Sequence, residues 1–181
     1  LIGGNTSSGV YKSNVSDPST LIYLGNVTEL NEIQMITNGI RFGGTVTLHN
    51  AIRALEEQLI SCSRDSFGVI QMIVEHMKKI AGQHVRGVGT LSGNIMMVKQ
   101  WGFHSDLATI LMTAEAKITC HIKVNTNKSE LRTLSLDELF KLKTNDLLIV
   151  SIDIPFSNVI DQDTSTTTTT TLLKTYKVAI R

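Results

Sequence analysis

Apolar side chains recur at helical spacing in several parts of the chain. They predict amphipathic helices over residues 48–61 and 66–81 and a further helix that starts at Ser105. On the first of these helices the inward positions are Leu48, Ile52, Leu55, Leu59 and Ile60. A capping-box pattern from Ser135 to Glu138 predicts a short helix over residues 136–142.

Other segments carry the pattern of β-strands. Thr37-Asn38-Gly39 lies between two short apolar runs, which predicts a β-hairpin. Residues 118–124 alternate apolar and polar and predict a half-buried strand, and residues 147–154 form an apolar run that Pro155 ends. Residues 1–24 are interpreted as a strand end, a loop and a second strand. The sequence therefore indicates a mixed α+β fold.

Both ends of the chain indicate a piece of a larger polypeptide. Leu1 begins an apolar segment directly, with no Met and no signal-peptide pattern. Residues 157–171 include six consecutive threonines and are typical of a low-complexity linker. The alternation over residues 172–181 predicts the first strand of a further domain.

Composition excludes several classes of function. The chain has 181 residues, 17 Lys+Arg, 16 Asp+Glu and a formal net charge of +1, which argues against a nucleic-acid-binding surface. No apolar run approaches the ~18–20 residues of a membrane span. Cys62 and Cys120 are far apart and lack the spacing of a zinc or iron–sulfur site, so we expect reduced, buried thiols in a cytoplasmic protein.

Two segments rich in glycine and hydroxyl groups are the candidates for ligand binding. They are Gly3 to Gly9, after a strand end, and Gly87 to Asn94, after a helix. Glycine lets the backbone approach a ligand closely, and Asn, Thr and Ser add hydrogen-bond donors. Together they predict two loops that close on one extended phosphorylated ligand. Each alone is also compatible with an ordinary turn, and neither fits a P-loop or the Rossmann glycine pattern.

The remaining polar and aromatic residues do not indicate a catalytic centre. The five histidines are scattered and lack metal-ligand spacing, so we expect surface or satisfied core residues. No G-x-S-x-G elbow is present, which argues against a nucleophilic hydrolase. Trp101 and Phe103 could stack on a planar ring, although simple packing is the more common role of aromatic residues beside a loop, and Met96-Met97 is interpreted as core. No catalytic residue or metal ligand is therefore expected.

The two segments taken together resemble a known family. Leu1 to Gly9, Gly89 to Ile95 and Ser105-Asp106-Leu107 occur in the order found in the FAD-binding domain of the xanthine dehydrogenase and aldehyde oxidase (molybdenum hydroxylase) family. The resemblance implies a vanillyl-alcohol-oxidase-like (PCMH-type) α+β fold of two lobes, truncated here at both ends. Residues 1–25 would end the first FAD-binding lobe, 26–156 would form the second, 157–171 the linker and 172–181 the start of a C-terminal flavoprotein lobe.

The resemblance also implies the cofactor site. Asp106 would hydrogen-bond the polar chain of FAD, Ile149 and Lys177 would line the site, and Ile80 stands where the family often has an aromatic residue near the adenine. The first FAD loop would comprise Leu1, Ile2, Gly3, Gly4, Asn5, Thr6, Ser7 and Ser8. The second, near the pyrophosphate and flavin, would comprise Thr90, Leu91, Ser92, Gly93 and Asn94. Ser92 stands at a usual glycine and Ser7 at a frequently acidic position.

The implied function is electron transfer from iron–sulfur centres through FAD to oxygen or NAD. The [2Fe-2S] clusters and the molybdenum-pterin would lie on other domains of the same polypeptide, which would form a homodimer and contact neither nucleic acid nor membrane. Residues 94–106 are more similar to plant-type aldehyde oxidases than to xanthine dehydrogenases. Two alternatives remain: a stand-alone FAD-dependent reductase of a sugar nucleotide, and a degenerate lobe kept for assembly.

Overall fold

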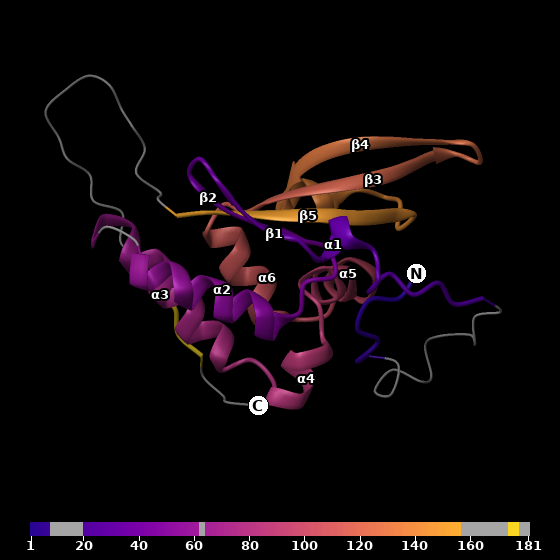
Figure 1. Cartoon of the computed structure of the whole chain (residues 1–181). Coiled ribbons are helices and arrows are strands. Elements are labelled where there is room, and N and C mark those ends of the chain that lie inside the picture. Colours follow the sequence, from indigo (N-terminus) through magenta and orange to yellow (C-terminus); the bar gives the residue numbers. More distant parts are fainter. Residues whose placement is uncertain (8–19, 62–63, 157–173, 178–181) are drawn as a thin grey trace, which may run out of the picture.

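The computed structural model describes residues 1–7, 20–61, 64–156 and 174–177. Its described residues form two layers, a five-stranded antiparallel sheet and a layer of helices (Figure 1). In Figure 1 the sheet lies above and helices α2 to α6 lie below it. The predicted α+β class is thus confirmed.

The sheet has the strand order β1-β2-β5-β3-β4. Its strands are β1 (Ile33–Ile36), β2 (Gly39–Gly43), β3 (Lys117–Asn125), β4 (Lys128–Ser135) and β5 (Leu147–Pro155). The predicted hairpin is confirmed, because Ile36 pairs with Gly39 and leaves Thr37-Asn38 as the turn. The predicted alternation in β3 is confirmed too, since Ile118, Cys120 and Ile122 are buried. β4 was not predicted from the sequence.

The helices cover the sheet and supply most of the core. They are α1 (Thr28–Asn31), α2 (Leu48–Ser61), α3 (Arg64–Lys78), α4 (Gln83–Val88), α5 (Leu91–Trp101), α6 (Asp106–Thr113) and α7 (Leu136–Lys141). The predicted helices over residues 48–61 and 66–81 correspond to α2 and α3. Ser105 caps α6, and Ser135 and Glu138 form the predicted capping box of α7. One inward position is wrong: Ile60, near the end of α2, is 88% exposed.

The glycine-rich segment from residue 82 to residue 93 is largely helical, so the prediction of a loop there is wrong. α4 occupies residues 83–88, and the first turn of α5 begins at Leu91. Thr90 starts this turn, because its side chain accepts a hydrogen bond from the Gly93 amide at 3.0 Å. Only Gly89 and Thr90 remain as a connection between the two helices.

The chain ends contain less regular structure than the sequence suggested. Ile2 and Tyr23 form an isolated parallel bridge instead of two strands. Residues 174–177 carry neither helix nor strand, so the strand predicted from residue 172 is absent over these four residues. The Thr-rich segment 157–171 and Cys62 lie outside the described residues, whereas Cys120 is a buried free thiol as expected. No helix among the described residues is long and apolar enough to cross a membrane.

Candidate functional site

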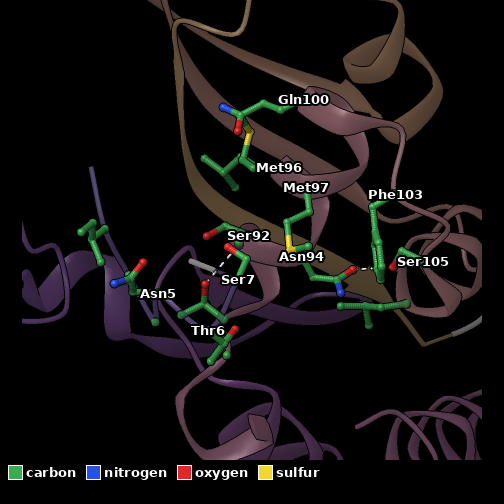
Figure 2. A pocket seen from close by; sticks show the side chains of 18 of the residues that line it. Asn5, Thr6, Ser7, Ser92, Asn94, Met96, Met97, Gln100, Phe103 and Ser105 are labelled. Carbon is green, nitrogen blue, oxygen red and sulfur yellow. Dashed lines mark hydrogen bonds between the residues drawn. The ribbon is translucent and has the colours of Figure 1, made fainter. Parts of the chain in front are cut away.

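The two candidate ligand-binding segments meet at a large cleft of about 1980 Å³. Its walls come from residues 1–7, the corner after α3, one face of α5, the start of α6, the beginning of β5 and residues 176–177. Figure 2 shows part of this lining, with Asn5, Thr6 and Ser7 approaching α5 from the N-terminal segment. Segments more than 80 residues apart in sequence thus meet at one cavity.

The N-terminal segment packs directly against the connection between α4 and α5. A Cβ atom built on Gly4 would lie 1.9 Å from the carbonyl oxygen of Val88, and one on Gly3 would lie 3.2 Å from Cγ2 of Thr90. Ile2 anchors the segment through backbone hydrogen bonds with Ile22 and Leu24, both at 2.8 Å. Gly4 is therefore required by close backbone contact, which holds the two candidate segments together.

Three hydrogen bonds fix the first turn of α5 at the wall of the cleft. Thr90 caps the helix, and the Leu91 amide donates to the carbonyl of Val46 at 3.1 Å. The Ser92 hydroxyl donates to the Gly44 carbonyl. The start of α5 is thus tied to the segment after β2, and Ser92, Gly93 and Asn94 lie at the surface of the cleft.

Asn94 is held by the helix that follows. The Ser105 hydroxyl donates to Oδ1 of Asn94, and its oxygen accepts from the Ala108 amide at 3.0 Å (Figure 2). Ser105 therefore caps α6 and at the same time orients the Asn94 amide group. Because Oδ1 accepts this bond, the NH2 group of Asn94 is the part of the side chain that can donate to a ligand.

Asp106 and Lys177 form an ion pair at the rim of the cleft. Asp106 is the first residue of α6, and Lys177 comes from the described segment 174–177. The Lys177 side chain is only 10% exposed. This pair joins two residues that the family resemblance placed in one site.

His76 on α3 is buried close to this ion pair. It is 7% exposed, and its Nε2 atom has no hydrogen-bond partner among the described residues. Burial lowers the pKa of His76, and Lys177 and Lys79 lower it further, while Asp106 acts in the opposite direction. The expectation that the histidines are surface or satisfied core residues is therefore wrong for His76.

We expect His76 to make stability fall as the solution is acidified. Because its folded pKa lies below the unfolded value of 6.5, the unfolded chain binds a proton that the folded chain resists as the pH drops below 6.5. Between pH 7.5 and 5.5 the wild type should lose more unfolding free energy than His76→Gln. Urea unfolding at both pH values measures this. The exposed His84→Gln is the control, and equal losses in wild type and His76→Gln would contradict the expectation.

The structure brings together nearly all predicted site residues that it describes. Gly3, Asn5, Thr6, Ser7 and the other described members of the first segment line the cleft, as do Ile80, Thr90, Ser92, Gly93, Asn94, Asp106, Ile149 and Lys177. Leu91 does not line it, because its side chain is 0% exposed in the core. Ser8 lies outside the described residues.

One face of α5 belongs to the cleft, whereas Met96 and Met97 on this face were predicted to be core; Met96 does pack against the core as well. Met96 and Met97 line the cleft, and so do Gln100 and Trp101 farther along α5 and Phe103 beyond it. Counted from Gly93, the residues on α5 fall at i+3, i+4, i+7 and i+8, the spacing of one helical face. This signal is present in the sequence, but it becomes visible only once a helix is placed over residues 91–101.

The fold and the cleft define an α+β domain with a site between its N-terminal segment and its helical layer. A family model described as the FAD binding domain in molybdopterin dehydrogenase matches residues 1–157. The chain therefore belongs to this family of FAD-binding domains, as the sequence motifs predicted. FAD is the cofactor that defines the family.

Similar proteins agree with this assignment. An indole-3-acetaldehyde oxidase of Arabidopsis thaliana is 33% identical over 184 residues, which cover 100% of this chain and 13% of that protein. The abscisic-aldehyde oxidase of the same plant is 31% identical over 156 residues, 86% of this chain and 11% of the relative. The chain thus spans about an eighth of these relatives.

Solved structures with the same fold are more distant in sequence. Carbon monoxide dehydrogenase from Hydrogenophaga pseudoflava has a TM-score of 0.63 at 22% identity, covering 86% of this chain and 50% of the compared one. Quinoline 2-oxidoreductase from Pseudomonas putida 86 has a TM-score of 0.61 at 18% identity, covering 87% and 51%. They show that the predicted fold class is right.

Proposed function

We propose that this domain holds FAD in an aldehyde-oxidase-type molybdenum enzyme and passes electrons from iron–sulfur centres through FAD to oxygen or NAD. One observation carries the proposal: the two glycine- and hydroxyl-rich segments pack against each other at the same cleft. The similarity to plant aldehyde oxidases supports this function over a sugar-nucleotide reductase and over a degenerate lobe.

The residues around the cleft fit FAD. Its volume of about 1980 Å³ exceeds the ~300–1,000 Å³ of common ligand pockets, so an extended dinucleotide has room. The side chains supply neutral donors suited to phosphate and hydroxyl groups, among them Thr6, Ser7, Ser92 and Asn94. Gly3 and Gly4 leave the backbone of the first segment without side chains where it meets Thr90 and Val88.

Each part of the chain has a distinct task in this proposal. Residues 1–7 and 90–94 would hold the pyrophosphate and flavin, and Asp106 and Lys177 would bind the polar chain of the cofactor. Met96, Met97 and Trp101 would shield the cofactor from water along one face of α5. When bound, FAD supplies the redox chemistry, and the protein contributes position and electrostatics.

The activity of the whole enzyme is part of the proposal, because the chain covers 13% of its relative in Arabidopsis thaliana. We propose iron–sulfur and molybdenum domains of the same polypeptide as partners, an aldehyde as the substrate class, a homodimeric assembly and a cytoplasmic location. The division into two FAD-binding lobes at residue 25, a linker and a C-terminal lobe is proposed with them. The names of the relatives support an aldehyde as the substrate class, and the family description supports a molybdenum domain as a partner.

Bound flavin is the direct test. We expect the full-length natural protein to show the two visible absorption bands of oxidised flavin and to release FAD on denaturation. Protein stripped of flavin should regain these bands when FAD is added. A protein that takes up no flavin after such reconstitution would refute the proposed function.

A further inference from the structure

The corner between α3 and α4, residues 79–82, forms part of the cleft wall, and one arginine binds this corner through hydrogen bonds. α3 ends at Lys78, and the following residues Ile80 and Ala81 both line the cleft. Ala81 has a φ of 53°, a left-handed conformation that a side chain disfavours. In Figure 1 this corner lies at the lower end of the helical layer, where α3 runs into α4.

Arg86 on α4 binds the end of α3. Its Nη1 atom donates to the carbonyl oxygens of Lys78 at 2.9 Å, Ile80 at 3.0 Å and Ala81 at 2.7 Å. The Lys78 carbonyl belongs to the end of α3, where backbone acceptors lack partners inside the helix and the helix dipole is negative. The Ile80 and Ala81 carbonyls follow it in the corner. A single guanidinium therefore satisfies three acceptors and holds the strained corner in place.

The positive charge of Arg86 affects whether the cleft can bind an anionic ligand. Uncovered, the C-terminal carbonyls of a helix present partial negative charge to the cleft and repel an anion. With the guanidinium on these carbonyls, the same wall carries a compensating positive charge. Ile80, Ala81 and Val85 then form a wall that is compatible with a phosphorylated ligand.

We propose that Arg86 is a positioning residue that compensates the charge at the end of α3 and so allows the cleft to accept the anionic FAD. This inference rests on the proposed function and adds to it a residue that does not itself line the cleft. Its two contributions, geometry and charge, make different experimental predictions. A geometric clamp acts equally at all salt concentrations, whereas compensation of charge weakens as salt screens it.

The test is a titration of the flavin-free, full-length natural protein with FAD, followed by flavin fluorescence. Arg86→Met keeps a side chain of similar length without the charge, and we expect its affinity for FAD to fall about tenfold at low salt. At ~1 M salt, where the Debye length is ~3 Å, this deficit should shrink to less than about threefold. Arg86→Lys restores a cation and should recover most of the affinity.

The control is Lys79→Met, which removes one exposed positive charge beside the same corner without touching the carbonyls. Its affinity for FAD should remain within about twofold of the wild type. The inference is wrong if Arg86→Met binds FAD as well as the wild type, if its deficit is the same at high salt, or if Arg86→Lys binds as poorly as Arg86→Met. Failure of the wild type itself to bind FAD would instead refute the proposed function, and this inference with it.

Discussion

Gly4→Ala should destabilise the domain and impair flavin binding. The new methyl group would lie 1.9 Å from the carbonyl oxygen and 2.8 Å from the carbonyl carbon of Val88. Both are backbone atoms, so the clash cannot be relieved by a change of rotamer. The N-terminal segment would have to move away from the end of α4. Overpacking of this kind costs ~1–3 kcal/mol, and the displacement opens the cleft where the two segments meet.

Gly87→Ala is the matched control for this substitution. Gly87 lies within α4, next to Val88 in sequence, and a Cβ atom there meets nothing within 4 Å. Alanine replaces glycine in a helix without strain, so stability should rise by ~0.5–1 kcal/mol. Urea unfolding and flavin content measure both variants. Equal stability of Gly4→Ala and wild type would contradict the close packing of the two segments.

Much of the fold follows from the sequence because periodicity reports burial. The spacing of Leu48, Ile52 and Leu55 predicts α2, and their burial confirms the assignment. The Asn38-Gly39 signal locates the β1–β2 hairpin, and its pairing register confirms it. β4 is different: it is an edge strand, with Leu131 exposed and Leu134 buried at its end, so its sequence carries little of the apolar alternation that marks a strand.

The glycine-rich region was harder to predict because local composition and tertiary contacts disagree there. Gly87, Gly89 and Gly93 favour a loop on propensity alone. In the folded chain, the Thr90 cap and the bond from the Leu91 amide to Val46 provide the contacts that start α5. Val46 lies far from this region in sequence, and a local pattern contains no information about such a partner.

Most of the candidate site could be located from the motifs, whereas the direction of each side chain could not. Chain order and composition predicted Thr90–Asn94 as part of the binding site. The first turn of α5 places the Leu91 side chain in the core and the Ser92 side chain at the cleft. The next turn of α5 places Met96 and Met97 at the cleft, where the sequence indicated core packing alone, and Met96 also packs against the core. The orphaned Nε2 of buried His76 depends on packing around α3, for which the sequence offers no signal.

Asn94→Asp should separate flavin affinity from stability. The Ser105 hydroxyl can donate to a carboxylate oxygen as it does to Oδ1 of Asn94, so the link between α5 and α6 is preserved. A negative charge in the first turn of α5 is also favourable for the helix. The unfolding free energy should therefore stay within ~0.5 kcal/mol of the wild type or rise slightly.

The same carboxylate lies in the part of the cleft proposed to hold the pyrophosphate, so it should repel the cofactor. Two like charges ~4 Å apart near a protein surface interact by several kcal/mol, and we expect affinity for FAD to fall about hundredfold, or ~3 kcal/mol. Asn50→Asp, the same substitution on the exposed face of α2, should leave affinity unchanged. Fluorescence titration with FAD and urea unfolding give both quantities. If Asn94→Asp retained wild-type affinity, Asn94 would lie away from the phosphates, and the cofactor would have to enter the cleft in another orientation.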